Sequence, residues 1–166
     1  DGKKTEMYRE QKQREDVKSE FSGIDDYLAS LELKVTIFNN DESLIPRMSQ
    51  LTQKLNQFNL TTKRYTESEI KNMVLSSNVE IFAFSLKDKF GDYGVTGLCI
   101  INLHEKNIAV IDNFLMSCRV IGRSVEYVFM DFIVNSLIQN KFKEIKSEFV
   151  KTKKNMQVEQ FYDNCS

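Results

Sequence analysis

A short basic stretch, Met116 to Ser124, holds the residues of this chain that are best suited to chemistry. The preceding run, 108–116, is rich in β-branched and large apolar residues, which predicts a buried strand. The residues that follow repeat at helical spacing, so we expect the strand to turn sharply into a helix near Gly122. Backbone N–H groups and the positive end of a helix dipole point out of such a junction. The junction is therefore suited to an anion.

The side chains of this stretch favour a phosphate or diphosphate as that anion. Arg119 and Arg123 carry forked donors that match phosphate oxygens. Gly122 lets the backbone approach a bound group closely, and Ser124 places a hydroxyl at the start of the helix. By spacing alone, solvated arginines beside a strand-ending glycine explain the pattern equally well.

Cys118 lies between the strand and these arginines, whose positive charge favours a thiolate. Such a thiol can carry an acyl group as a thioester. A cysteine at a strand end is more often a small buried apolar residue, and this alternative stays open. Cys99, Cys118 and Cys165 are odd in number and widely spaced, which predicts reduced thiols and no metal site.

Two family resemblances involve this stretch. The segment Arg119-Val120-Ile121-Gly122-Arg123-Ser124 resembles the Arg/Gln-x-x-Gly-x-Gly/Ala pyrophosphate loop of the GNAT superfamily of N-acetyltransferases, with Ser124 in place of Gly or Ala. The closer resemblance is to FkbH-like proteins, and it lies in three blocks, at 56–65, 90–94 and 116–123.

The FkbH-like resemblance implies a function in polyketide biosynthesis. Those proteins attach a three-carbon glyceryl unit to an acyl carrier protein, for extender units such as methoxymalonyl. In them a HAD-type phosphatase domain of subfamily IIIC precedes the acetyltransferase-like domain. The resemblance thus implies an acyltransferase-like half of a bifunctional glyceryl transferase/phosphatase, which binds a phosphopantetheine thioester on CoA or carrier protein. The alternative is a non-catalytic module that docks the carrier protein or positions the phosphatase domain.

The GNAT resemblance also implies roles outside the loop. Free backbone groups of Phe114, Leu115 and Met116 would bind the pantetheine arm where their strand splays from the next strand. Asn155 and Tyr162 match an Asn…Tyr helix in which the tyrosine often protonates the departing thiolate.

Alternatives to catalysis remain at several positions. For Tyr162 the alternative is aromatic packing at the domain edge, which is favoured because no paired base is visible in the sequence. Strand position makes Asp112 and Glu80 candidate general bases. The expected catalytic residues are thus Tyr162, Cys118 and Asp112. The residues expected to bind the cofactor are Phe114, Leu115, Met116, Arg119, Val120, Ile121, Gly122, Arg123, Ser124 and Asn155.

The elements that position these residues follow from periodicity and turn chemistry. They predict a mixed α/β fold with a mainly antiparallel sheet flanked by helices, which is similar to the GNAT order. The expected strands are 33–38, 79–87, 95–103, 108–116 and 144–150, with turns at 91–94 and 104–107. The expected helices are 44–55, 66–74, 125–140 and 155–162. One helix face should bury Val125, Val128, Phe129, Phe132, Ile133 and Leu137.

The polar linker 58–65 has no clear period. On chemistry alone, Asn56, Asn59, Thr61 and Thr62 are expected to shape this loop by hydrogen bonds to its backbone. A functional role is the alternative that the FkbH-like resemblance raises.

The chain ends suggest the domain organisation. Residues 1–32 are dense in charges of both signs, which predicts a solvated helix. The FkbH-like resemblance implies that this helix is a connector from an upstream HAD-type domain. It also implies that residues 33–166 are the acetyltransferase-like domain, which we expect to lack its last strands. A sheet edge left open in this way can pair with another copy of the chain.

Composition excludes several classes of protein. Hydrophobic residues make up 41% of the chain and charged residues 28%, which is typical of a soluble globular protein. The apolar runs are too short to span a bilayer and no signal segment opens the chain, so a cytoplasmic location is expected, with no membrane partner. A formal net charge of -1 gives no general attraction to nucleic acid.

Overall fold

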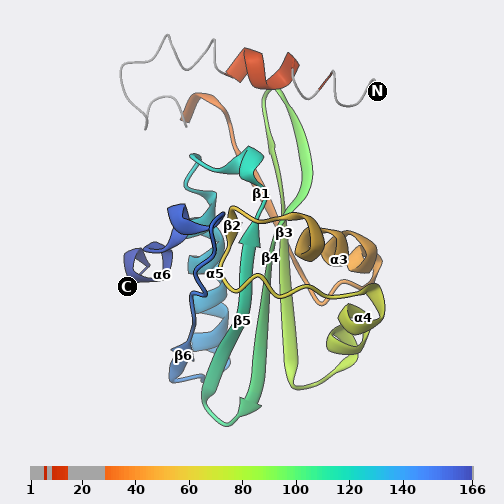
Figure 1. Ribbon diagram of the computed structural model, residues 1–166, viewed down its shortest axis with the longest axis vertical. Helices are drawn as coiled ribbons and strands as arrows, with labels where there is room; N and C mark the ends of the chain where they lie inside the picture. The colour runs from red at the N-terminus through yellow and green to blue at the C-terminus, as the bar shows by residue number, and fades with distance from the viewer. Residues whose placement is uncertain (1–5, 7–8, 15–28, 166) are drawn as a thin grey trace. The chain divides into compact units, whose positions relative to one another are not determined.

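The computed structural model describes residue 6, residues 9–14 and residues 29–165 (Figure 1). The strands are β1 (Lys34–Asn39), β2 (Phe58–Asn59), β3 (Val79–Asp88), β4 (Gly91–Glu105), β5 (Ile108–Met116) and β6 (Glu144–Lys146). The α-helices labelled in Figure 1 are α3 (Ile45–Lys54), α4 (Glu67–Leu75), α5 (Val125–Gln139) and α6 (Phe161–Asn164). The described residues also form three short 3-10 helices, η1 (Glu42–Leu44), η2 (Cys118–Val120) and η3 (Met156–Val158).

The strands form one mixed sheet in the order β1-β3-β4-β5-β2, and β6 pairs with β5. β4 and β2 pair with β5 in the antiparallel sense, whereas β6 is parallel to it. The predicted fold class, a mixed and mainly antiparallel sheet flanked by helices, is confirmed. No helix among the described residues has both the length and the apolar character needed to cross a bilayer.

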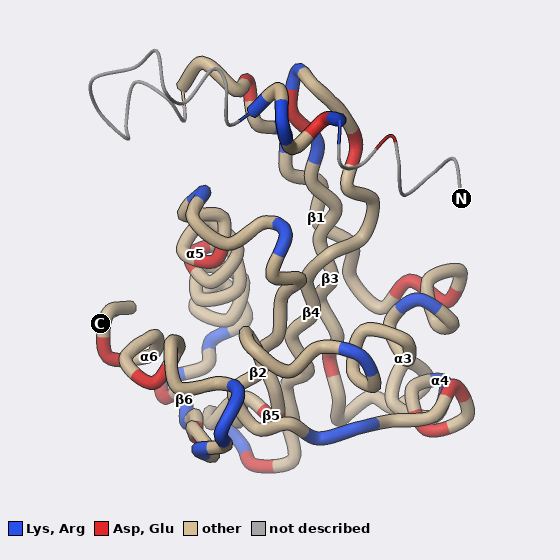
Figure 2. Tube along the Cα trace, turned by 45° about the horizontal axis from the view of Figure 1, so that its top comes forward, with Lys and Arg blue, Asp and Glu red and all other residues tan. Residues whose placement is uncertain are grey.

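The alternation of side chains along β3 explains why helices cover both faces of the sheet. Ile81 and Ala83 belong to a core that also contains residues of α3 and α4. Their neighbours point the other way, where the Phe84 ring centroid lies 4.8 Å from that of Phe129 on α5. Figure 2 shows α5 on one side of the strands and α3 with α4 on the other.

Local signals set the starts of α4, α3 and η1. Thr66 accepts a hydrogen bond from Glu69 N, and the Glu69 carboxylate accepts one from Thr66 N, which completes the capping box of α4. Pro46 lies in the first turn of α3, where its missing N–H leaves no bond unmade. Asp41 caps η1 by accepting from Ser43 N at 3.0 Å.

Three predicted boundaries are wrong. The β3–β4 turn lies at Lys89 and Phe90 rather than at 91–94, because Asp88 Oδ1 accepts from the N–H groups of Phe90 and Gly91. The strand expected over 144–150 ends at Lys146. The helix expected over 155–162 is divided into η3 and α6.

The buried face of α5 also differs from the expectation. Val128 and Phe132 are 54% and 46% exposed, whereas Met130 is buried. Apolar residues cover most of this helix, so their spacing did not single out one stripe. Phe129, Ile133 and Leu137, at successive intervals of four, make the fully buried stripe.

The chain divides into two compact units, one with residues up to Thr36 and Ser85–Gly94, the other with Ile37–Phe84 and Val95–Ser166. In the first, Arg14 is 1% exposed and forms an ion pair with Asp88. Its guanidinium carbon lies 4.3 Å from the centroid of the Tyr93 ring. The prediction of a fully solvated connector is therefore wrong at Arg14. Residues 15–28 of the predicted helical connector lie outside the described residues.

Asp88→Asn is expected to lower the free energy of unfolding by about 3 kcal/mol, because the Arg14 charge would stay buried without its counter-charge. The amide keeps an acceptor for the turn N–H groups, so the substitution tests the charge itself. Urea unfolding measures the loss. Glu6→Gln is the matched control, since it removes an ion pair to Arg9 that is 65% and 55% exposed and should change little. Equal effects of the two substitutions would contradict the prediction.

Candidate functional site

The turn that follows β5 is built from a short 3-10 helix and two left-handed residues. Ser117 caps η2 by accepting from Arg119 N at 3.4 Å. Gly122 has φ +92° and Ser124 φ +59°, and α5 begins at the next residue, as the sequence predicted. A Cβ at Gly122 would meet nothing within 4 Å, so this glycine serves backbone conformation and leaves open space beside the turn. Ser124 is exposed and makes no capping bond to α5.

The two arginines of this turn behave differently. Arg123 is only 8% exposed, and its Nη1 donates to Arg119 O at 2.9 Å and to Ile121 O at 3.3 Å. Arg123 therefore shapes the turn, and its expected role as a phosphate donor stays a prediction. Arg119 is half-buried and Val120 is fully buried. Arg119, Gly122 and Ser124 are thus the members of the predicted loop with accessible surface suited to an anion.

The prediction of free backbone groups on Phe114, Leu115 and Met116 is wrong. All three residues are fully buried, and their strand is paired on both sides. Gly97, Leu98 and Cys99 of β4 lie opposite them on one side. On the other side β2 pairs Phe58 with Met116 and Asn59 with Leu115, and Leu60 N donates to Phe114 O at 3.2 Å. A strand of the chain itself occupies the place expected for a pantetheine arm.

β5 and β6 pair over a short stretch and then separate, which leaves a gap between them that β2 fills. These parallel strands share only three residue pairs, Ile108–Glu144 to Val110–Lys146. Beyond Lys146 the chain leaves β5, and Val150 N donates to Leu60 O at 2.7 Å. The segment 58–61 therefore lies between β5 and the continuation of β6.

Three fully buried asparagines hold this segment in place. Asn113 Nδ2 donates to Asn59 Oδ1 at 2.8 Å, and Asn113 Oδ1 accepts from Thr61 N at 3.0 Å. Asn155 Nδ2 donates to Asn59 O and to Val150 O, both at 2.9 Å. Because both amide donors are used within the chain, the structure assigns Asn155 a structural role rather than the predicted ligand contact.

The loop-shaping interpretation of the polar linker is confirmed. Asn59 Oδ1 accepts from Thr62 N at 2.9 Å, and Thr61 Oγ1 donates to Asp112 O at 2.9 Å. Arg64 Nη2 donates to Asn56 Oδ1 at 2.6 Å. Some of these partners lie on β5, about fifty residues away, which the sequence pattern did not indicate.

The candidate bases already have partners. Asp112 accepts from the Tyr65 hydroxyl and, at 2.8 Å, from Lys63 Nζ. Burial, and then the hydrogen bond to Asp112, raises the pKa of Tyr65. Glu80 Oε1 accepts from Asn39 Nδ2 at 2.6 Å. As bases both residues stay predictions, and the contacts of Asp112 show that it ties the linker to β5.

Tyr162 lies on α6, and its hydroxyl is buried without a hydrogen-bond partner among the described residues. Burial raises the pKa of this phenol, so it is protonated at physiological pH and able to donate. The ring also packs near Phe161, with centroids 5.5 Å apart. Tyr162 can therefore both pack against its neighbours and donate a proton. Its role as a general acid stays a prediction.

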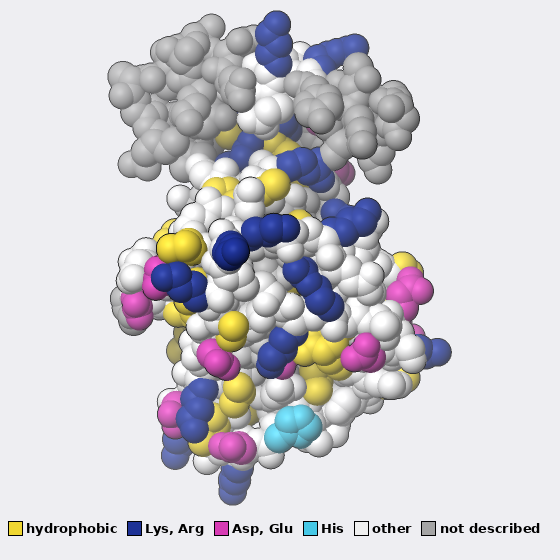
Figure 3. All heavy atoms as spheres, in the orientation of Figure 1, with side chains coloured by type: hydrophobic (Ala, Val, Ile, Leu, Met, Phe, Trp, Pro, Cys, Tyr) yellow, Lys and Arg dark blue, Asp and Glu magenta, His cyan; other side chains and the backbone are white. Residues whose placement is uncertain are grey.

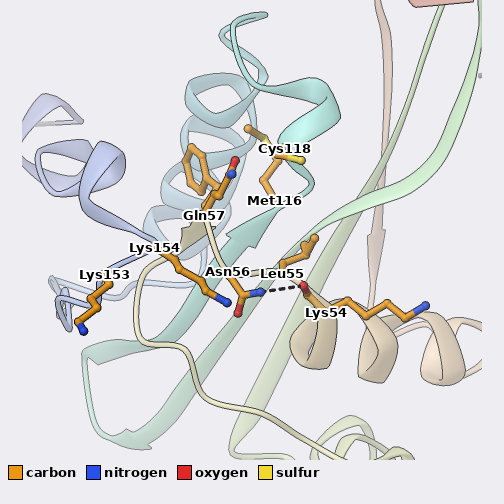
Figure 4. A pocket seen from close by; sticks show the side chains of 9 residues that line it. Lys54, Leu55, Asn56, Gln57, Met116, Cys118, Lys153 and Lys154 are labelled. Atoms are coloured by element: carbon orange, nitrogen blue, oxygen red, sulfur yellow. Dashed lines mark hydrogen bonds between the residues drawn. The ribbon is translucent and has the colours of Figure 1, made fainter. Parts of the chain in front are cut away.

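Cys118 is exposed and lines a cavity of about 580 Å³. The other lining residues are Lys54, Leu55, Asn56, Gln57, Phe58, Met116, Lys153 and Lys154. Three are lysines and none is acidic. In Figure 4, Lys154 points toward Asn56, while Lys54 and Lys153 point outward. The alternative of a buried strand-end cysteine is therefore wrong, and Cys118 lies in a basic pocket.

Sequence reasoning missed the lysines of this pocket. They come from the end of α3 and from the segment before η3, about a hundred residues apart. The only signal near them was the block at 56–65, three of whose residues line the cavity.

No protein-family model matches the sequence, and no curated protein does. Solved structures do match. The ribosomal-protein-S18-alanine N-acetyltransferase from Escherichia coli superposes with TM-score 0.59 and 11% identity, over 79% of this chain and 76% of the other. The ribosomal-protein-alanine N-acetyltransferase from Brucella melitensis biovar Abortus 2308 gives TM-score 0.59 and 11% identity, over 80% and 91%. Rv2747 from Mycobacterium tuberculosis, in complex with CoA and NLQ, gives 0.58 and 10%, over 78% and 69%.

These similarities establish the fold: the chain shares the fold of these N-acetyltransferase structures and of Rv2747. The residues at the turn fit a diphosphate, with open space at Gly122 and an exposed hydroxyl at Ser124. The gap between β5 and β6 does not fit a pantetheine arm, because residues 58–61 fill it.

Proposed function

We propose that this chain is an acyltransferase-like domain that acts on a phosphopantetheine thioester, carried by CoA or by an acyl carrier protein. The proposal places it in glyceryl or methoxymalonyl extender-unit formation, in the cytoplasm, beside a HAD-type phosphatase domain. The observation that carries it is the exposed thiol of Cys118 in a basic cavity, directly before the turn at Gly122.

The chemistry assigned to Cys118 is exchange between two thioesters. Its thiolate attacks the thioester carbonyl, and the bond from that carbon to the carrier sulfur breaks. The acyl group is then bound to Cys118, and the released carrier thiolate takes up a proton. The lysines around the cavity favour an anionic ligand, and the turn at Gly122 offers an anion site next to it.

The filled gap sets the route that such an arm takes. It reaches Cys118 through the cavity lined by Gln57 and Lys154 instead of pairing with β5. A ligand bound in this way contacts the outer side of β2.

A non-catalytic docking module is the second candidate. The filled gap and the occupied carboxylate of Asp112 favour it, because both remove parts expected of an acetyltransferase site. In that case the basic cavity would bind the carrier protein without transfer of the acyl group.

Acylation of Cys118 distinguishes the two candidates. The chain is incubated with acetyl-CoA and with an acylated carrier protein, and intact-protein mass spectrometry follows the adduct. We expect an adduct on the unmodified chain that is lost in Cys118→Ser. Cys165→Ser is the matched control and should keep the adduct, because burial, and then the charge of Glu126, raises the pKa of the Cys165 thiol to about 11. Carrier-protein binding without an adduct would support the docking module instead.

A further inference from the structure

Arg47 on α3 carries a charge that its hydrogen-bond partners do not neutralise. Its Nε donates to Val95 O at 3.0 Å and its Nη1 to Gln50 Oε1 at 2.5 Å. Both partners are uncharged. The guanidinium is half-buried, so water screens its charge only in part.

The start of β4 joins Arg47 to the turn that follows β5. Thr96 follows Val95, whose carbonyl Arg47 binds. The backbone carbonyl of Thr96 accepts a hydrogen bond from Ser117 N at 2.7 Å. Ser117 in turn caps η2 through Arg119 N. The Thr96 hydroxyl at this junction is fully buried and has no hydrogen-bond partner within the described structure.

Arg47 and Arg119 are like charges, and the hydrogen bonds through Val95, Thr96 and Ser117 place Arg47 beside the turn that carries Arg119. Burial, and then the positive charge of Arg119, lowers the pKa of the Arg47 guanidinium. An anion between two such groups would offset their repulsion, and the forked donors of arginine match the oxygens of a phosphate.

Other basic residues continue this site toward Cys118. Lys54 follows Arg47 by two turns of α3 and lines the cavity together with Lys153 and Lys154. Figure 3 shows Lys and Arg side chains gathered on the face around β2 and α3. The helix that carries Arg47 thus ends at the basic cavity that Cys118 lines.

We infer that Arg47 and Arg119 bind a phosphate group of the ligand, which makes Arg47 a binding residue that lies outside the turn at Gly122. Its place in catalysis rests on the proposed function, because the bound phosphate would hold the ligand beside Cys118. The phosphate can belong to the phosphopantetheine arm or to a separate phosphate ester, and the experiment separates these sources.

Calorimetric titration with inorganic phosphate, CoA, and pantetheine without its phosphate tests the site. Arg47→Gln is expected to weaken phosphate and CoA binding about tenfold, the scale of one charge-assisted hydrogen-bonded pair. Pantetheine binding should not change. Arg47→Lys keeps the charge but loses the forked donors, so its affinity for phosphate should lie between that of the unmodified chain and that of Arg47→Gln. If inorganic phosphate binding weakens but CoA binding does not, the phosphate belongs to a separate ester.

Lys71→Gln, an equal change of charge on the exposed face of α4, is the matched control and should bind normally. Equal weakening in both variants, or unchanged phosphate binding in Arg47→Gln with its unfolding midpoint preserved, overturns the inference. The phosphate titration needs no acyl transfer, and Cys118→Ser should bind phosphate normally. A failure of Cys118 to become acylated therefore leaves the Arg47 site intact. Equally, a failure of Arg47 to bind phosphate leaves the acylation of Cys118 intact.

Discussion

Gly97→Ala is expected to lower the free energy of unfolding by about 4 kcal/mol, the cost of losing a buried phenylalanine from its packing. A Cβ at Gly97 would lie 1.7 Å from Phe84 Cε2. The Phe84 ring is fully buried and packs on Phe129 of α5, so it has no free space to move into. Gly97 also pairs with Met116 at the end of β5. The strain therefore reaches the strand that positions Cys118.

Urea unfolding measures this effect, and a double-mutant cycle tests its cause. Phe84→Leu combined with Gly97→Ala should recover part of the loss, because the smaller side chain leaves room for the new methyl group. Gly94→Ala is the control: its Cβ meets nothing within 4 Å, but φ is +68°, so only about 1 kcal/mol of backbone strain is expected. A Gly97→Ala protein as stable as this control, without coupling to position 84, would refute the packing argument.

Asn113→Ala is expected to cost a similar amount, about 4 kcal/mol, because it leaves several buried polar groups without partners. Asn113 Oδ1 accepts from Thr61 N at 3.0 Å and from Phe114 N at 2.9 Å. Its Nδ2 donates to Asn59 Oδ1 at 2.8 Å. These bonds attach the segment 58–61 to β5, so their loss should loosen β2 as well as lower stability.

Two measurements separate the local effect from the global one. Urea unfolding gives the stability, and hydrogen exchange at the Leu60 amide, which donates to Phe114 O, reports the opening of β2. Asn135→Ala on the exposed face of α5 is the control and should change stability by less than about 0.5 kcal/mol. If the Leu60 amide keeps its protection in Asn113→Ala, the asparagine does not hold the segment.

Several features of this protein follow from short-range sequence alone. The strand 108–116 and the turn at Gly122 are set by a local apolar run and by a positive φ that glycine adopts without strain. The capping box joins Thr66 to Glu69, only three residues further on, so the local sequence is enough to form it. The alternating pattern of these elements was enough to predict the fold class. The basic character of the turn at Gly122 was also visible in the sequence.

The interior of the site depended on contacts between distant segments. β2 has only two residues, too few for any period, and it exists because Asn59 and Asn113, fifty-four residues apart, bond to each other. Asn155 meets Asn59 across ninety-six residues, which turned an expected ligand into a support. The lysines that line the cavity with Cys118 likewise come from two distant segments, the end of α3 and the segment before η3. The reason is physical: which polar groups remain available to a ligand depends on which others the folded chain brings within hydrogen-bond distance.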